Sequence, residues 1–493
     1  MMTRQTKNTT TVWRRPWRGL VPLTVAALLT TGCDLEVFSP STVDEETLDT
    51  HNSIEALWSG AMGQVSHMGP GQAGVGGFFT FGALRTDELV HSGHPHGSTA
   101  TFEPLPHLRA YSDGAPIEPS WEPVDELWNQ SMMTRYVADF GVQRSREIYE
   151  MFKDDPVAAV RDKVTRDLIR MYAWSGVAYR VLGDNLCHAV IDGGPAEPRE
   201  VFYERGLAHV TEGIQFAEEN QVLDVDEFGA TAAYAVRAQL NMLLGNWDAA
   251  EADAAQVVTG YRGLQTEHTD TEPGFRQRLY LRWLDYLEDR HMTLWGTPFL
   301  EWGWNTSQAA GFRNDYRVTY SYHRTGANPH REFGTDGRRT WFRQTKELSI
   351  YGSKLLAKGR EMRLIEAEAR LRQGDIAGMT TKINELREWY NAPTGGAFER
   401  DGHPLPMLDV PATVQEAWDV FMKERGIELW LEGRRLADIR RWSVDPGFVN
   451  TTVVREAASG QPASEDLRRD VLDINGDFCI PIGATERRLN PNL

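Results

Sequence analysis

The chain has 493 residues, of which 41% are hydrophobic and 25% are charged. These are the proportions of an ordinary globular protein, and they exclude a largely disordered one. A chain of this length usually divides its core between two or more packed units. The formal net charge is −18, and no block of Lys and Arg with interleaved aromatic residues is present. Because an acidic surface repels phosphate backbones, the composition argues against nucleic acid as a partner.

The first 32 residues have the three-part arrangement of a secretory signal peptide. Five basic residues, the last of them Arg18, precede an apolar run from about Leu20 to Leu29 and then small residues. That run is too short to remain as a membrane-spanning helix. The pair Gly32–Cys33 resembles a lipobox, in which the cysteine thiol is acylated and becomes the first mature residue. We therefore predict a signal peptide over residues 1–32 and a lipid anchor on Cys33; the alternative is an ordinary signal peptide without lipid.

Cysteines are few in this chain. They are Cys33, Cys187 and Cys479, and no Cys-x-x-Cys pair suggests a zinc or redox site. We expect no disulfide framework from this count.

The next segments alternate between loop and helix signals. Residues 34–60 are expected to form an extended tether that leads into a first helix. Residues 69–104 are rich in Gly, Pro and His and are predicted to be loop. From residue 121 to residue 148, apolar residues recur at helical spacing and predict one long amphipathic helix. These apolar positions are Val124, Leu127, Met132, Tyr136, Val137, Phe140 and Val142.

Three later stretches resemble one another: Ala173–Cys187, Ala235–Ala249 and Leu364–Gly378. Aligned on a glycine, each has a small residue seven positions earlier and Asp or Asn immediately afterwards. Small residues let two helices approach closely, and a Gly followed by Asn or Asp ends one helix and caps the next. The pattern resembles the helix-turn-helix unit of tetratricopeptide repeats. The aligned glycines are Gly183, Gly245 and Gly374, and the small residues are Gly176, Ala238 and Ala367. Such units either dock peptides or serve only as a scaffold, and we favour the scaffold.

Two segments interrupt the helical pattern. Residues 391–413 carry too many Gly and Pro for a helix and are predicted to be a surface excursion. Gly274–Tyr351 is different again, because its part from Trp295 to Phe342 contains eleven aromatic residues in 48. Within it, Tyr316, Val318, Tyr320 and Tyr322 alternate with polar residues, which predicts a strand with one aromatic face.

This aromatic segment is the candidate binding region. Aromatic faces stack on sugar rings and other flat apolar ligands, while neighbouring polar side chains satisfy the ligand's polar groups. Trp302 and Trp304 have the same two-residue period as the strand. The alternative is that the aromatic residues pack a small hairpin layer onto the scaffold. The candidate ligand-binding residues are Trp302, Trp304, Arg313, Asn314, Asp315, Tyr316, Tyr320, Tyr322 and Trp341.

Known catalytic motifs are missing from the sequence. No Gly-x-Ser-x-Gly elbow, phosphate-binding Gly-rich loop or His-Glu-x-x-His helix is present. His91, His94 and His96 are spaced so that they could share a metal ion, but such a tract is more often a polar loop, and we predict no metal site. Paired carboxylates for glycoside hydrolysis stay open, because 70 acidic residues make many pairs.

Two segments near the C-terminus have distinctive sequences: Glu424–Trp442 is ERGIELWLEGRRLADIRRW, and Cys479–Leu493 is CIPIGATERRLNPNL. Both resemble signatures of the SusD/RagB family of outer-membrane lipoproteins. In that family a helix of the type ER-x-x-EL-x-x-EG-x-R-x-x-D-x-RRW precedes a segment of the type PIP-x-x-E-x-x-x-NPNL. Gly82–Gly93 lies where members often carry an Asp-Glu segment, and Asp192–Pro195 is also similar. From its spacing, we predict that Glu424–Trp442 is one helix with an ion-paired face that holds the fold rather than performing catalysis.

The resemblance implies a mainly α fold, with a scaffold of tetratricopeptide-like helical pairs, irregular loops and short β-hairpins. Residues 33–493 would form one SusD-like domain, with the scaffold mainly at 120–260 and 355–443 and the aromatic-rich region at 274–351. It also implies a non-catalytic protein without cofactor that is lipid-anchored at the outer membrane and exposed at the cell surface. Such a protein passes a nutrient, often an oligosaccharide, to a SusC-like TonB-dependent channel. The alternatives are a surface glycoside hydrolase and a peptide-docking tetratricopeptide scaffold.

Overall fold

The structure is a computed structural model. It describes residues 49–68, 77–92, 122–222, 229–267, 292–306, 314–322, 333–334, 340–346, 352–393, 404–443 and 479–493. The chain divides into Met1–Leu48 and Asp49–Leu493, and every described residue belongs to the second unit. The predicted signal peptide and Cys33 therefore lie outside the described residues. Of the helices that are described, none combines the length and the apolar character needed to cross a membrane.

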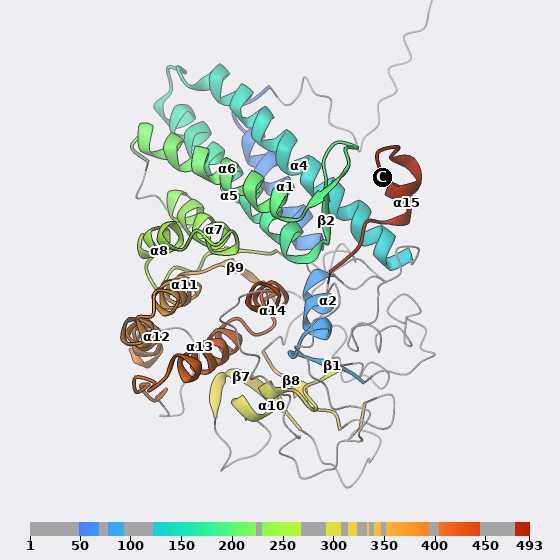
Figure 1. Cartoon of the computed structure of the whole chain (residues 1–493). Helices are drawn as coiled ribbons and strands as arrows, with labels where there is room; N and C mark the ends of the chain where they lie inside the picture. The colour runs from blue at the N-terminus through green and yellow to red at the C-terminus, as the bar shows by residue number, and fades with distance from the viewer. Residues whose placement is uncertain are drawn as a thin grey trace, which may run out of the picture. The chain divides into compact units, whose positions relative to one another are not determined.

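The described part of the chain is mainly helical, as the sequence predicted (Figure 1). The helices are α1 (Ser53–Met68), α2 (Phe78–Arg85), α4 (Glu122–Phe152), α5 (Ala158–Asn185), α6 (Glu200–Glu219), α7 (Ala230–Leu243), α8 (Trp247–Ala255), α10 (Pro298–Trp302), α11 (Gly359–Arg372), α12 (Ile376–Asn391), α13 (Val414–Glu428), α14 (Arg435–Ser443) and α15 (Ala484–Leu489). The long amphipathic helix is confirmed as α4. One of its apolar positions is an exception, because the Tyr136 side chain is 56% exposed and stacks on Phe140.

Two of the three predicted helical pairs are confirmed. α7 is followed by Gly245 and α8, and α11 is followed by Gly374 and α12. Both glycines have positive φ, 78° and 80°, which is the left-handed conformation that ends a helix and that glycine adopts most readily. The Asp375 side chain then accepts a hydrogen bond from the Gly378 amide at 2.7 Å and caps α12.

The first predicted pair is wrong at its turn. Gly183 lies inside α5 and does not end it, and the chain continues into a strand instead of a second helix. The glycine is needed for packing, because a Cβ atom there would lie 2.3 Å from the ring of Tyr203 on α6. The small residue seven positions earlier, Gly176, likewise admits Val210 of α6. The pair is therefore α5 with α6, joined through a β-hairpin.

The helical pairs follow one another through direct packing. α5 packs on α6 and α7, and α7 packs on α8. α8 in turn contacts α11, which also packs on α12 and α13 (Figure 1). The largest core cluster draws buried side chains from α1 through α8, α11 and the α13–α14 turn. A second core cluster is built from α11, α12, α13 and the strand β7 (Asp315–Ser321).

The strands are short and form small sheets. β2 (His188–Val190) and β3 (Ala196–Pro198) form an antiparallel hairpin, and β6 (Gly303–Asn305), β7 and β8 (Arg343–Gln344) form a three-stranded sheet in the order β6-β7-β8. β6 is parallel to β7, and β8 is antiparallel to it. The remaining pairs are β1 (Val90–His91) with β5 (Met292–Thr293), and β4 (Leu264–Gln265) with β9 (Leu355–Ala357).

Two local expectations are corrected by the structure. The predicted loop over residues 69–104 contains α2 and β1, because FFTF at its centre buries apolar side chains in the core. The predicted single helix over Glu424–Trp442 is broken after Glu428, and α14 begins only at Arg435. The break includes Leu431 and Gly433, whose φ angles are 59° and 74°, outside the range of a right-handed helix.

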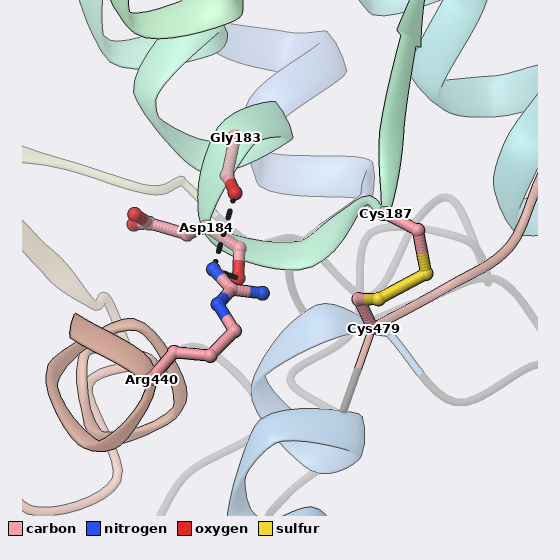
Figure 2. The surroundings of a disulfide bond; sticks show 5 residues. All are labelled: Gly183, Asp184, Cys187, Arg440 and Cys479. Atoms are coloured by element: carbon pink, nitrogen blue, oxygen red, sulfur yellow. Dashed lines mark hydrogen bonds between the residues drawn. A yellow bond between two sulfur atoms is a disulfide. The ribbon is translucent and has the colours of Figure 1, made fainter. Parts of the chain in front are cut away.

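A disulfide joins Cys187 and Cys479 across 292 residues of sequence (Figure 2). The sequence excluded a disulfide framework but did not foresee this single bond. It lies beside backbone pairing between the two segments, because Cys187 N donates to Ile480 O at 3.0 Å and Ile480 N donates to Asn185 O at 2.8 Å. Arg440 of α14 donates to the carbonyl oxygens of Gly183 and Asp184 (Figure 2). A cation at this position satisfies carbonyls that the last turn of α5 leaves free.

Candidate ligand-binding region

The predicted binding segment is built from α10, β6, β7 and β8, and its aromatic residues divide into two groups. The first group is buried. Tyr316, Tyr320 and Trp341 are 6%, 8% and 3% exposed. Tyr316 belongs to the second core cluster and Tyr320 to the largest one, and the Trp341 indole nitrogen donates to the Met292 carbonyl at 3.2 Å. Their rings therefore pack the hairpin layer, which was the alternative to ligand binding. Whether they also contact a ligand stays a prediction.

The second group, Trp302, Trp304 and Tyr322, is only half-buried. The Trp302 ring lies edge-on to Phe299 with a centroid distance of 5.0 Å, and the Lys423 ammonium is 5.8 Å from the Trp302 ring centroid. The shared two-residue period of Trp302 and Trp304 was wrong as evidence for one strand, because Trp302 ends α10 and Trp304 lies on β6. The alternation along β7 itself is confirmed as a strand. Among the predicted ligand residues that the structure describes, these three are the aromatic ones that keep accessible surface.

The three polar residues predicted to contact the ligand, Arg313, Asn314 and Asp315, have different surroundings. Arg313 lies outside the described residues. Asn314 is exposed, and its amide donates to the Glu301 carbonyl. Asp315 is engaged by Arg317, whose guanidinium donates to both carboxylate oxygens at 2.9 and 2.7 Å. Burial alone would raise the pKa of Asp315, but the charge and hydrogen bonds of Arg317 outweigh it and hold the pKa below its usual value. Asp315 therefore has an internal partner already.

The carboxylates of Glu424, Glu428 and Glu432 are buried and ion-paired. Their partners come from other elements rather than from the same helix face. Glu424 pairs with Arg317 of β7 at 2.8 Å and with Arg387 of α12 at 2.5 Å. Buried cations and carboxylates at such distances neutralise each other and are costly to separate. The prediction that these carboxylates pair along one helix face is therefore wrong, because their ion pairs join elements that are distant in sequence.

Glu428 is the most heavily engaged of these carboxylates. It receives Lys358 at 3.0 Å and Arg360 at 2.9 Å, and the Tyr390 hydroxyl donates to it at 2.9 Å. Burial would raise the pKa of Glu428, but the charges of Lys358, Arg360 and Arg317 outweigh it and hold the pKa well below its usual range. A carboxylate that stays ionised with every oxygen occupied does not act as a general acid or base at neutral pH.

The segment around Asp87 and Glu88 contacts the start of α14. The Arg435 guanidinium donates to both oxygens of Asp87 at 2.7 and 2.6 Å. Glu88 accepts a hydrogen bond from the Leu431 amide at 2.6 Å, in the turn between α13 and α14. Burial raises the pKa of Glu88 to about 7, and the Leu431 hydrogen bond only partly opposes this rise. Glu88 is one residue whose environment the sequence did not reveal.

No group of three His, Cys, Asp or Glu side chains suited to a metal ion occurs within the described ranges. Of the histidine tract, His91 lies on β1, and His94 and His96 lie outside the described residues.

We compared the sequence and the fold with those of known proteins. Residues 360–493 match the family model of the SusD family. The fold matches a SusD superfamily protein from Bacteroides vulgatus at 14% identity and a TM-score of 0.59, covering 90% of this chain and 98% of that one. Residues 360–493 thus match the SusD family, and the chain has the fold of SusD-like proteins.

Two further solved structures show the same fold. A SusD-like carbohydrate binding protein from Bacteroides vulgatus has 14% identity and a TM-score of 0.57, with 90% of this chain and 97% of that chain covered. Surface glycan-binding protein A from Bacteroides uniformis has 14% identity and a TM-score of 0.53, with coverage of 90% and 99%. No curated protein matches the sequence. The mainly α, tetratricopeptide-like fold implied by the sequence resemblance is confirmed.

The segments that carried the SusD resemblance contact one another in the fold. The Asp-Glu segment meets the α13–α14 segment through Asp87 and Arg435. The Asn490 side chain donates to the Gly194 carbonyl at 2.9 Å, and the Asn492 side chain donates to the Gly193 carbonyl at 2.7 Å. The SusD-family signature is therefore, in physical terms, a set of contacts between segments that lie far apart in the chain.

Proposed function

We propose that this protein is a non-catalytic lipoprotein of the outer membrane that binds an oligosaccharide and passes it to a SusC-like TonB-dependent channel. The observation that carries the proposal is the SusD fold over 90% of the chain, together with the family match at residues 360–493. Two proteins of the same fold are named for binding carbohydrate or glycan. The partner channel and the surface location follow from the family resemblance.

The cysteines support export and lipidation independently of the family. Disulfides persist in oxidising compartments and are rare in the cytosol. Cys187 and Cys479 pair with each other, so the third cysteine of the sequence, Cys33, is not part of that bond. A single cysteine that directly follows a signal-peptide-like segment is the residue that lipid attachment requires.

The ligand site is proposed at the accessible aromatic residues of the candidate region, Trp302, Trp304 and Tyr322. A half-buried ring fixed by packing offers one face for stacking at a small loss of side-chain entropy. The exposed Asn314 lies on the same segment and can supply hydrogen bonds to ligand hydroxyls. Buried cations pair with Glu424, Glu428 and Glu432. These ion pairs argue against the glycoside hydrolase alternative, because the carboxylates are already occupied.

Replacing Trp302 with Ala is expected to weaken oligosaccharide binding by about 1–3 kcal/mol, or about ten- to hundredfold in Kd. The loss follows from removal of a stacking face. A glycan array identifies the ligand, and titration calorimetry measures Kd for the wild type and the variant. Product analysis of the incubated ligand accompanies the titration.

Trp247→Ala is the matched control, because Trp247 is also a half-buried tryptophan but lies on α8, where Arg372 covers its ring. This variant should keep the wild-type Kd. Tyr320→Ala should instead lower stability by about 3–5 kcal/mol, as the loss of a buried aromatic ring does. Equal affinity in Trp302→Ala and wild type would move the site elsewhere, and turnover of the ligand would overturn the binding role.

Replacing Cys33 with Ser is expected to release the protein from membranes. An acyl chain contributes about 0.8 kcal/mol per buried methylene to membrane affinity, and the serine variant has no thiol to acylate. Detergent phase partitioning of both proteins from expressing cells measures the effect. Partitioning of the wild type into the aqueous phase would contradict the lipid anchor while leaving the binding role untouched.

A further inference from the structure

Residues 404–413 run along α12 as an extended segment without helix or strand. Two asparagines of α12 each make a reciprocal pair of hydrogen bonds with its backbone. The Asn384 side chain donates to the Leu408 carbonyl at 3.0 Å and accepts from the Leu408 amide at 2.8 Å. The Asn391 side chain makes the same pair with Leu405, at 2.9 and 2.8 Å.

Arg387, which lies between the two asparagines on α12, makes a fifth hydrogen bond to the segment. Its guanidinium donates to the Pro406 carbonyl at 2.5 Å and is itself held by Glu424 of α13. Positions 384, 387 and 391 lie three and four residues apart, so their side chains share one face of the helix. This face therefore presents two amides and one cation in a row, all of them bound to main-chain atoms of residues 405–408.

The bonded positions match the chemistry of a proline-containing peptide. Pro404 and Pro406 have no amide hydrogen to donate. The backbone amides that donate to α12 are those of Leu405 and Leu408. Proline favours the polyproline II conformation, which has three residues per turn. Residues 405 and 408 then fall on the same side of the segment.

The side chains of the segment follow the same division. Leu405 is 5% exposed in the second core cluster, and Leu408 packs partly against that cluster. Met407 and Val410, by contrast, are 45% and 57% exposed. Two leucines in the pattern Leu-x-x-Leu thus provide the apolar contacts, and main-chain bonds provide the rest. Recognition by main-chain bonds does not require the bound strand to be connected to the protein.

We propose that the face of α12 that carries Asn384, Arg387 and Asn391 is a binding site for extended, proline-containing peptides of the pattern Pro-Leu-Pro-x-Leu, and that Pro404–Pro411 occupies it as an internal ligand. The site is separate from the proposed oligosaccharide site and does not depend on it. An internal segment competes at a high effective concentration, about millimolar for a short connection. A free peptide of the same chemistry therefore binds only when the internal segment is weakened.

The test uses the full mature chain and a fluorescent, end-capped peptide of sequence PLPMLDVP, followed by fluorescence anisotropy. Replacing both Leu405 and Leu408 with Gly removes the apolar contacts of the internal segment and leaves the face of α12 unchanged. This double variant should bind the peptide at least about tenfold more tightly than the wild type. A peptide with glycine in place of both leucines should not bind.

Asn384→Ala in the double-variant background should weaken peptide binding by about tenfold, because two main-chain bonds are lost. Glu388→Ala is the matched control, since Glu388 lies on the same helix with an exposed side chain, and it should leave the Kd unchanged. Circular dichroism and a thermal melt check folding.

Equal and weak binding by the wild type and the double variant would overturn the proposal, and so would an Asn384→Ala variant with unchanged affinity. Should the double variant fail to fold, Leu408→Gly alone replaces it, because Leu408 is only partly buried. Unfolding of that single variant would show that the segment is an inseparable part of the core and would also overturn the proposal.

Discussion

Replacing Glu428 with Gln is expected to lower the free energy of unfolding by about 3–5 kcal/mol. The substitution leaves Lys358 and Arg360 without the carboxylate that they share, and the Lys358 side chain is only 2% exposed. Lys358 keeps Glu432 as a partner, but Arg360 loses its carboxylate, and breaking a buried ion pair is strongly destabilising. Urea denaturation at pH 7 measures the difference from the wild type.

The pH dependence of this effect has a definite sign. The pKa of Glu428 is depressed below its ordinary value of 4.5, so its carboxylate stabilises the folded state above that pH and loses the effect as the pH falls through the folded-state pKa. The difference between wild type and variant should therefore be full at pH 7 and shrink in strong acid. Glu388→Gln, at an exposed position on α12, should change stability by less than about 0.5 kcal/mol. A Glu428→Gln variant as stable as the wild type at pH 7 would refute the structural role of this carboxylate.

Replacing Cys479 with Ser is expected to lower stability by about 2–5 kcal/mol, the usual effect of removing a native disulfide. Part of the effect arises because the bond restricts the unfolded chain between Cys187 and Cys479, which are 292 residues apart. A thermal melt under oxidising conditions compares the variant with the wild type.

The double variant with Ser at both positions 187 and 479 serves as the control for this prediction. It should be no less stable than the single variant, because the bond is already lost. A reductant should lower the melting temperature of the wild type and leave that of both variants unchanged. Insensitivity of the wild type to reductant would show that the bond does not form.

The helical scaffold could be predicted from the sequence because its signals are local. The period of α4 and the glycine turns at Gly245 and Gly374 depend on residues within one or two helical turns. The turn at Gly183 failed for a reason that local sequence does not contain. That glycine accommodates the ring of Tyr203, and only the packed structure shows which helix approaches it.

The candidate binding region could be predicted less well, and burial explains why. The alternating aromatic residues of β7 predict a strand, but alternation alone does not say whether the aromatic face meets ligand or core. Tyr316 and Tyr320 face core clusters, whereas Trp302 and Trp304 keep part of their surface accessible. The ion pairs of Glu424 and Glu428 were similarly hidden, because their partners are supplied by β7, α11 and α12 and not by neighbours in the same helix.

The disulfide has a topological consequence for proteolysis. Cys187 and Cys479 close a covalent ring that contains α6 through α14 and every predicted ligand residue. A single cleavage of the backbone anywhere between these cysteines opens the ring and leaves both fragments joined through sulfur. A protein exposed to extracellular proteases can therefore be cut once between these two cysteines and still remain one covalent molecule.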